Sequence, residues 1–168
     1  MAMIFILGHQ QFPTHLSTKL QKIKDTLKNN SRSRDVGDCF RVEIVLASDE
    51  SAVSATGSSA SSMEVYNIAL MNTVVPYFKD FEFDTNVELV LVGQYISTST
   101  ATDPYTVDCT NCTINEQLEN FRDWGNNGGF GSINYDLAHN ITNHFPPPGT
   151  VGLAYVGAVG STVYKYGV

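Results

Sequence analysis

The sequence lacks long apolar segments and is poor in charged residues. No apolar run approaches the roughly 20 residues that a membrane-spanning helix requires. The N-terminus contains an apolar stretch of only Met3–Leu7 with no basic residue before it, which is a poor match to a signal peptide. Charged residues account for 16% of the chain and hydrophobic residues for 42%, which is typical of a globular protein. The sequence therefore predicts a globular domain without a membrane span.

Positive charge is scarce, with 10 Lys and Arg residues against 17 Asp and Glu residues and a formal net charge of -7. The acidic residues are not clustered along the chain. A surface of this sign repels polyanions, so neither nucleic acid nor an anionic membrane is expected as a partner. A solvated acidic surface explains the charge without any specific function.

Cysteine is also rare, with only Cys39, Cys109 and Cys112. An odd number leaves one thiol unpaired or waiting for a partner elsewhere. Cys109 and Cys112 form a C-x-x-C motif, which in redox proteins opens a helix after a buried strand. Here the motif follows the polar segment Ser97–Asp108, so a disulfide, either local or to another segment, is the favoured interpretation.

Three N-glycosylation sequons occur, at Asn29, Asn111 and Asn140. Each triplet is a weak signal by itself, because such triplets arise often by chance. Together with the cysteines they favour a secreted or extracellular protein.

Residues 1–38 differ in character from the rest of the chain and are expected to form an N-terminal extension or the tail of a pro-segment. Thr14 is a candidate N-cap for a helix whose apolar residues recur at i, i+4, i+7 and i+11. These apolar residues are Leu16, Leu20, Ile23 and Leu27. The polar segment Asn29–Asp38 is typical of an exposed linker, so the globular domain is expected to span residues 39–168.

The globular part alternates strands and helices. Capping boxes begin two predicted helices, at Ser61–Glu64 and at Thr113–Glu116. The Ser/Ala/Gly-rich residues 49–62 are expected to form a loop. The predicted strands are Arg41–Ser48, Asn86–Ile96 and Val151–Val159. This order predicts an α/β fold in which helices pack on a sheet whose early part is parallel.

Several segments of this domain carry a family resemblance. Leu118–Trp124 has the form L-x-x-F-x-x-W, and Tyr135–His139 (YDLAH) is followed by Thr150–Gly157 (TVGLAYVG). With the opening strand Val42–Asp49 (VEIVLASD), this order resembles the upper subdomain of reprolysin-like zinc metalloproteases, the ADAM-type (M12B) branch of the metzincins. The resemblance implies a twisted mixed sheet, mostly parallel with one antiparallel edge strand, packed by helices. It also implies that the chain is the N-terminal part of a secreted zinc endopeptidase domain, which hydrolyses peptide bonds in the intact protein.

Two features depart from that family. Gly160 stands where the family has a cysteine, and the zinc-binding H-E-x-x-H-x-x-G-x-x-H would lie beyond Val168. No histidine of this chain precedes a Glu, and no two are four residues apart as a zinc-binding helix requires. The four histidines are His9, His15, His139 and His144. We therefore expect no catalytic residue and no zinc site in this chain, which alone is predicted to be inactive, and we expect zinc only in the intact domain.

The resemblance assigns substrate binding to an edge strand. Its residues are Gly152, Leu153, Ala154, Tyr155, Val156 and Gly157. An exposed edge offers unpaired N–H and C=O groups that an extended polypeptide can satisfy. The expected partner is thus a polypeptide substrate, or a partner chain that adds a strand at the sheet edge. From the residues alone, an ordinary buried strand whose glycines serve packing is the alternative.

By the same resemblance, Glu43 and Asp136 are candidate calcium ligands, and carboxylate oxygens suit this hard cation. The remaining ligands would come from parts of the intact domain outside this chain. Two acidic side chains in ordinary surface pairs are the alternative.

The sequence also leaves other functions open. One is a non-catalytic extracellular binding or assembly module that uses the same sheet and its exposed edge strand. Another is an unrelated secreted α/β domain. The glycine-rich residues 126–131 follow a helix rather than a strand, which disfavours a phosphate-binding loop. No serine lies in a G-x-S-x-G motif, so a serine nucleophile is not indicated.

Overall fold

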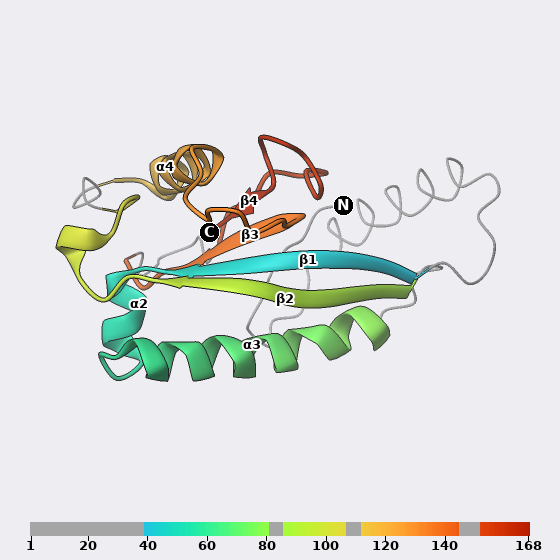
Figure 1. Ribbon diagram of the computed structural model, residues 1–168, viewed down its shortest axis with the longest axis horizontal. Helices are drawn as coiled ribbons and strands as arrows, with labels where there is room; N and C mark the ends of the chain where they lie inside the picture. Colours follow the sequence, from blue (N-terminus) through green and yellow to red (C-terminus); the bar gives the residue numbers. More distant parts are fainter. Residues whose placement is uncertain (1–38, 81–85, 107–111, 145–151) are drawn as a thin grey trace, which may run out of the picture.

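The computed structural model describes residues 39–80, 86–106, 112–144 and 152–168 (Figure 1). The helix predicted within residues 1–38, the sequons at Asn29 and Asn111, and Cys109 lie outside the described residues. No helix within the described ranges is long and apolar enough to cross a membrane.

The described chain forms a four-stranded sheet with a helix against each face. In chain order the elements are β1 (Cys39–Ser48), α2 (Glu50–Ala55), α3 (Ala60–Asp80), β2 (Asn86–Ile96), the 3-10 helix η1 (Thr100–Thr102), α4 (Ile114–Asn126), β3 (Leu137–Ile141) and β4 (Tyr166–Gly167). The strand order is β2-β1-β3-β4, and each neighbouring pair is parallel. Figure 1 shows α3 on one face of the sheet and α4 on the other. The predicted α/β class is confirmed.

The central strand β1 is buried on both faces of the sheet. Ile44 and Leu46 pack in the cluster that includes α3, whereas Val45 and Ala47 pack in the cluster that includes Phe121 of α4. Successive side chains of a strand point to opposite faces, so a strand covered on both sides needs apolar residues at consecutive positions. This requirement explains the unbroken hydrophobic run in the middle of β1.

Helix α4 begins at its predicted capping box. Thr113 Oγ1 accepts a hydrogen bond from the Glu116 N–H at 3.3 Å, and Glu116 Oε2 accepts one from the Thr113 N–H at 2.7 Å. The buried face of α4 then joins an aromatic cluster whose ring centroids lie 4.8 to 6.4 Å apart. Its members are Tyr95, Tyr105, Phe121, Trp124, Phe130 and Tyr166. Because this cluster connects α4 with β2 and β4, it fixes the helix over the end of the sheet.

The loop predicted for residues 49–62 is wrong. Asp49 caps α2, since its Oδ1 accepts a hydrogen bond from the Ala52 N–H at 3.0 Å. Helix α3 begins at Ala60, and its cap is Ser59, whose Oγ accepts from the Ser62 N–H at 3.1 Å. The predicted capping box at Ser61 is therefore two residues too late.

The predicted strand Val151–Val159 is also wrong, and with it the expected antiparallel edge strand. The four strands described are all parallel, and residues 152–168 add one isolated antiparallel bridge, between Ala154 and Gly167. Gly157 and Gly160 have φ angles of 72° and 73°, in the left-handed region that glycine favours. These two turns end the extended backbone before a full strand can form.

Candidate functional site

The segment 152–157 begins along the outer side of β4. The N–H of Leu153 donates to the C=O of Val168 at 2.6 Å, and the Val168 N–H donates back to the Leu153 C=O at 2.8 Å. Two residues further on, the Tyr155 N–H donates to the Tyr166 C=O at 3.4 Å. The pairing is therefore antiparallel and short.

Ala154 and Gly167 face each other between those hydrogen-bonded positions. In an antiparallel ladder, residues in such a non-hydrogen-bonded pair direct their N–H and C=O groups away from the partner strand. The N–H and C=O of Ala154 thus point to the outer side of the segment. This is the direction from which an extended polypeptide adds to the edge of a sheet.

Glycines allow the close approach between this segment and the sheet. A Cβ atom on Gly167 would lie 2.8 Å from His139 Nδ1 and 3.2 Å from the Ala154 Cβ. A Cβ atom on Gly152 would lie 3.0 Å from the carbonyl oxygen of Val168. Larger residues at either position would therefore push the segment away from β4.

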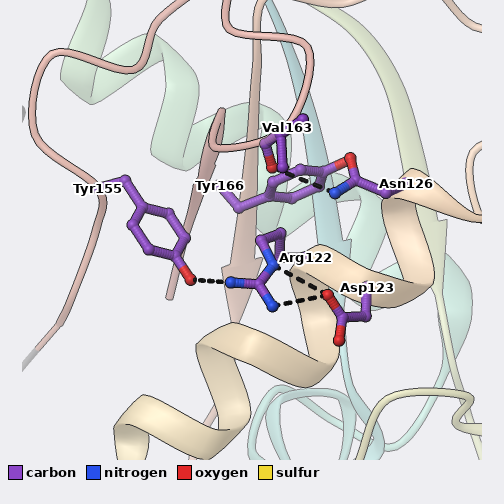
Figure 2. Close-up of polar contacts among 6 residues, drawn as sticks. All are labelled: Arg122, Asp123, Asn126, Tyr155, Val163 and Tyr166. Carbon is purple, nitrogen blue, oxygen red and sulfur yellow. Dashed lines mark hydrogen bonds and ion pairs between the residues drawn. The ribbon is translucent and has the colours of Figure 1, made fainter.

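An arginine of α4 holds the side chain of Tyr155 (Figure 2). Nη1 of Arg122 donates to the Tyr155 hydroxyl at 2.8 Å, and its Nε and Nη2 donate to Asp123 Oδ1 at 2.9 and 2.8 Å. The guanidinium carbon lies 5.8 Å from the Tyr155 ring centroid and 5.9 Å from that of Tyr164, close enough for cation–π attraction to both. Arg122 therefore connects the 152–157 segment to the helix.

A second connection joins β4 to the end of α4. The Tyr166 hydroxyl donates to Asn126 Oδ1 at 3.0 Å, and Asn126 Nδ2 donates to the Val163 carbonyl at 3.2 Å (Figure 2). The Tyr135 and Tyr166 hydroxyls are also 2.8 Å apart. Burial is the main cause that raises the pKa of Tyr166 well above its usual range, with the hydrogen bond to Tyr135 adding to it. The Tyr166 hydroxyl thus stays protonated and serves as a fixed hydrogen-bond group.

The surface beside this segment is open and largely apolar. A depression of about 360 Å³ lies next to Tyr155. Of the residues that line it, Val156 is 76% exposed, whereas Ala158 is buried. The lining residues are Tyr155, Val156, Gly157, Ala158, Ser161 and Tyr164.

The two candidate calcium ligands lie next to each other. The Glu43 N–H donates to Asp136 Oδ2 at 2.9 Å, and the Asp136 N–H donates to the Glu43 carbonyl at 2.8 Å. The Glu43 carboxylate lies 3.5 Å from Arg41. Burial lowers the pKa of Lys165. The nearby Asp136 carboxylate acts against this effect, because it favours the charged form of Lys165. The structure brings the two residues together through the backbone of Glu43, and each carboxylate has a cation nearby.

The remaining candidates differ in their surroundings. Cys112 is disulfide-bonded, which confirms the predicted disulfide for this cysteine. Asn140 lies in β3 and is only 1% exposed. Its side chain would have to leave the protein interior to carry a glycan.

Residues 40–168 match the sequence model of Reprolysin_5, described as metallo-peptidase family M12. The match covers most of the chain. This chain belongs to metallopeptidase family M12. The family resemblance predicted from the segments between Val42 and Gly157 is thereby confirmed.

Comparison with solved structures supports the fold of this M12 domain. A chain in "Structure of a chaperone-substrate complex" has a TM-score of 0.55 and 20% sequence identity. The similarity covers 77% of this chain but only 20% of that chain, so this chain spans about a fifth of its length. At this level of identity the likeness shows the fold alone. No curated protein matches this sequence.

The family M12 implies a zinc ion in the intact enzyme, but the histidines described here do not fit one. His139 keeps some accessible surface, yet the protein packed around its ring lowers its pKa to about 4 by desolvation. His144 is exposed and follows β3 in a separate turn. Among the described residues, no three His, Cys, Asp or Glu side chains are grouped as metal ligands would be.

Five residues that hold the segment 152–157 and β4 in place were not predicted from the sequence. They are Arg122, Asp123, Asn126, Tyr164 and Tyr166. One signal was present, because Arg122 is the only Lys or Arg between Lys79 and Lys165. A lone cation in a long acidic stretch indicates a specific contact. The partner of that cation depends on tertiary structure, which the sequence pattern does not give.

Proposed function

We propose that residues 39–168 are the substrate-binding part of a zinc metalloendopeptidase domain. In this proposal the segment 152–157 binds a polypeptide substrate as an added antiparallel strand. Membership of family M12 supports a peptidase function. The observation that carries the proposal is the outward direction of the Ala154 N–H and C=O groups beside β4. Zinc and its ligands would come from sequence outside this chain.

The chain's own residues would bind and orient the substrate. The Ala154 N–H would donate to a substrate carbonyl, and the Ala154 carbonyl would accept from a substrate N–H. Two such bonds fix the direction and register of the peptide, and its side chains then alternate between the two sides of the edge. Exposed Val156 provides apolar contact next to these bonds. We assign no catalytic step to the described residues, among which His139 and His144 are not grouped with other metal ligands.

Glu43 and Asp136 are proposed to contribute to a structural calcium site in the intact domain. Calcium takes six to eight oxygen ligands, and the carboxylates of these two neighbouring residues would supply only part of such a shell. The other oxygens would come from elsewhere in the intact protein. Arg41 and Lys165 would balance the two carboxylates when calcium is absent.

Secretion is a further part of the proposal. The disulfide at Cys112 supports an oxidising compartment, where such bonds persist. Asn29 and Asn111 remain candidate glycosylation sites on that basis. The extension of residues 1–38 would precede the domain as a pro-segment tail or linker.

A second candidate is a non-catalytic extracellular binding or assembly module. It is supported by the short pairing beside β4, which leaves the outward Ala154 N–H and C=O groups in place for a partner strand. In that case the outer side of 152–157 would bind a strand of a partner chain instead of a substrate. Both candidates use the same hydrogen-bonding groups, so they differ in what happens to the bound polypeptide.

Peptide binding tests the role of the edge. The probe is fluorescein-labelled oxidised insulin B chain, an extended polypeptide, followed by fluorescence anisotropy. Replacing Ala154 by proline removes the outward N–H without removing a bond to β4, and we expect at least tenfold weaker binding. Ala154→Ser keeps the N–H and should stay within twofold of the unaltered chain. Equal affinities for the proline and serine variants would contradict the proposal.

A second probe avoids any question of whether Ala154→Pro folds. The same peptide with N-methyl groups at alternate residues cannot donate hydrogen bonds to the edge, and it should lose binding to the unaltered chain. The intact mass and zinc content of the native protein then separate the two candidates. About one zinc per chain with chelator-sensitive cleavage of the probe supports the peptidase, whereas binding without zinc or cleavage supports the module.

A further inference from the structure

The depression beside Tyr155 has two aromatic walls. The ring centroids of Tyr155 and Tyr164 lie 5.0 Å apart, at an interplanar angle of 65°. Tyr164 is 49% exposed and Val156 is 76% exposed, so apolar surface of both is open to solvent. None of the six residues that line the depression is charged. Its volume of about 360 Å³ is near the lower end of the range for ligand pockets, about 300 to 1,000 Å³, which leaves room for one large side chain.

The depression belongs to one face of the edge segment. Tyr155 packs in the same hydrophobic cluster as α4, and its hydroxyl accepts the hydrogen bond from Arg122, so its side chain lies on the α4 face. Successive side chains of an extended segment alternate, so the Ala154 side chain lies on the other face, beside Gly167. A bound peptide can therefore reach the depression only with side chains that point to the α4 face.

The hydrogen bonds proposed at Ala154 determine which peptide residue this is. In an antiparallel pair, the residue opposite Ala154 exchanges both hydrogen bonds with it, and the residue before it in the peptide lies opposite Tyr155. That preceding residue forms a non-hydrogen-bonded pair, in which the Cα atoms are only about 4.5 Å apart and the side chains are closest. Directly opposite side chains share one face of a sheet. The side chain of the preceding residue is therefore placed against Tyr155, at the depression.

An aromatic side chain matches this surface best. A ring placed here packs on two tyrosine rings that already form an edge-to-face pair, an arrangement that aromatic rings favour. A charged side chain would lose its hydration without meeting a charged residue in the lining. Arg122 is not open to an acidic guest, because its Nη1 donates to Tyr155 while its Nε and Nη2 donate to Asp123.

We propose that the depression is a specificity subsite for an aromatic side chain, carried by the peptide residue immediately before the one that hydrogen-bonds to Ala154. Tyr155 and Tyr164 are the residues that determine this specificity. The inference rests on the proposed binding of a polypeptide at Ala154. It adds the class of sequence that the edge selects, namely an extended segment with Phe, Tyr or Trp at that position.

Peptides that differ at one position test the selection. The probes are fluorescein-labelled nine-residue peptides of alternating Thr and Ser with one variable central residue, followed by fluorescence anisotropy on the full chain. A central Phe should bind at least tenfold more tightly than a central Ala, Glu or Lys, and at least threefold more tightly than a central Leu. Equal affinity for the Phe and Ala peptides, with both still weakened by Ala154→Pro, would overturn the subsite and leave the proposed function standing. Failure of every peptide to bind would overturn both.

Substitution of Tyr164 tests the aromatic wall. Tyr164→Ala should reduce the ratio of Phe to Ala peptide affinity to less than threefold, while the affinity for the Ala peptide stays within twofold. Tyr164→Phe keeps the ring and should keep the preference. Tyr77→Ala is the matched control and should also keep it, because Tyr77 is 60% exposed on α3, on the other face of the sheet (Figure 1). An unchanged ratio in Tyr164→Ala would contradict the assignment.

N-methyl groups on the Phe peptide test the register with the unaltered chain. In the proposed register the N–H of the residue after Phe faces the Ala154 carbonyl, so methylating it should weaken binding at least tenfold. The N–H of Phe itself points away from the edge, so methylating it should change the affinity by less than twofold. The reverse pattern would place the Phe side chain on the Ala154 face and would overturn the proposal.

Discussion

Arg122 Nη1 and the Tyr155 hydroxyl form a 2.8 Å hydrogen bond between residues 33 positions apart in the sequence. One partner lies in α4 and the other in the segment beside β4. The guanidinium also contacts the rings of Tyr155 and Tyr164. The Arg122 side chain thus links the candidate edge directly to the helix.

Replacing Arg122 by leucine should loosen this connection. The loss of one hydrogen bond and of the cation–π contacts is expected to lower the free energy of unfolding by about 1 to 2 kcal/mol. Urea unfolding followed by tryptophan fluorescence measures this change. Arg122→Lys keeps the charge but not the forked geometry, and we expect it to recover less than half of the loss. Full recovery by lysine would show that the charge alone matters.

Gly125 is a second point of close contact. A Cβ atom there would lie 2.4 Å from Cε1 and 2.6 Å from the hydroxyl oxygen of Tyr166. Although alanine is the better helix former, Gly125→Ala should destabilise the domain by about 1 to 3 kcal/mol, because the Tyr166 ring must move. Asn115→Ala, at an exposed position of the same helix, is the control and should change stability by less than about 0.5 kcal/mol. The thermal midpoint of each variant decides the matter, and a stabilised Gly125→Ala would contradict the packing seen here.

His139 predicts a specific pH dependence. Desolvation lowers its pKa from 6.5 to about 4 in the folded chain, so the folded state disfavours the protonated ring. Between these two values only the unfolded chain takes up the proton, and stability therefore falls as the pH is lowered from 6.5 to 4. The stability that the neutral His139 ring contributes is fully present above pH 6.5. Its loss at lower pH amounts to about 3 kcal/mol at most.

The His139 contribution is separated from that of other groups by a difference between variants. His139→Gln removes the proton uptake, so the slope of stability against pH between 6.5 and 4 should be smaller than in the unaltered chain. Asp49, whose pKa is raised by burial, acts in the opposite direction in both the unaltered chain and His139→Gln, and so cancels in that comparison. Identical slopes for His139→Gln and the unaltered chain would refute the assignment.

The sequence correctly predicted the elements whose local sequence pattern matches the environment that they occupy in the fold. The strand Asn86–Ile96 and the capping box at Thr113 are confirmed, because two-sided apolar character and a reciprocal cap are both local features. Helix α2 was missed because its cap, Asp49, lies in a stretch rich in Ser, Ala and Gly. The strand at Val151–Val159 failed because glycines that resemble strand residues in sequence adopt turns at positions 157 and 160.

The candidate site shows the same division. The adjacency of Glu43 and Asp136 followed from the family resemblance and is present in the structure. The contact of Arg122 with Tyr155 depends on how α4 lies over β4, which no local pattern encodes. Asn140 illustrates the converse, since its sequon is visible in the sequence but its burial in β3 is not.

The shortness of β4 has a consequence for solubility. A sheet that ended in a long, flat strand would offer a template on which copies of the chain could stack into aggregates. Here the last strand has two residues, and the segment beside it turns away at Gly157. At this edge only a brief stretch of backbone is open to pairing, which disfavours continued growth from copy to copy there, whereas β2 at the opposite edge of the sheet has 11 residues.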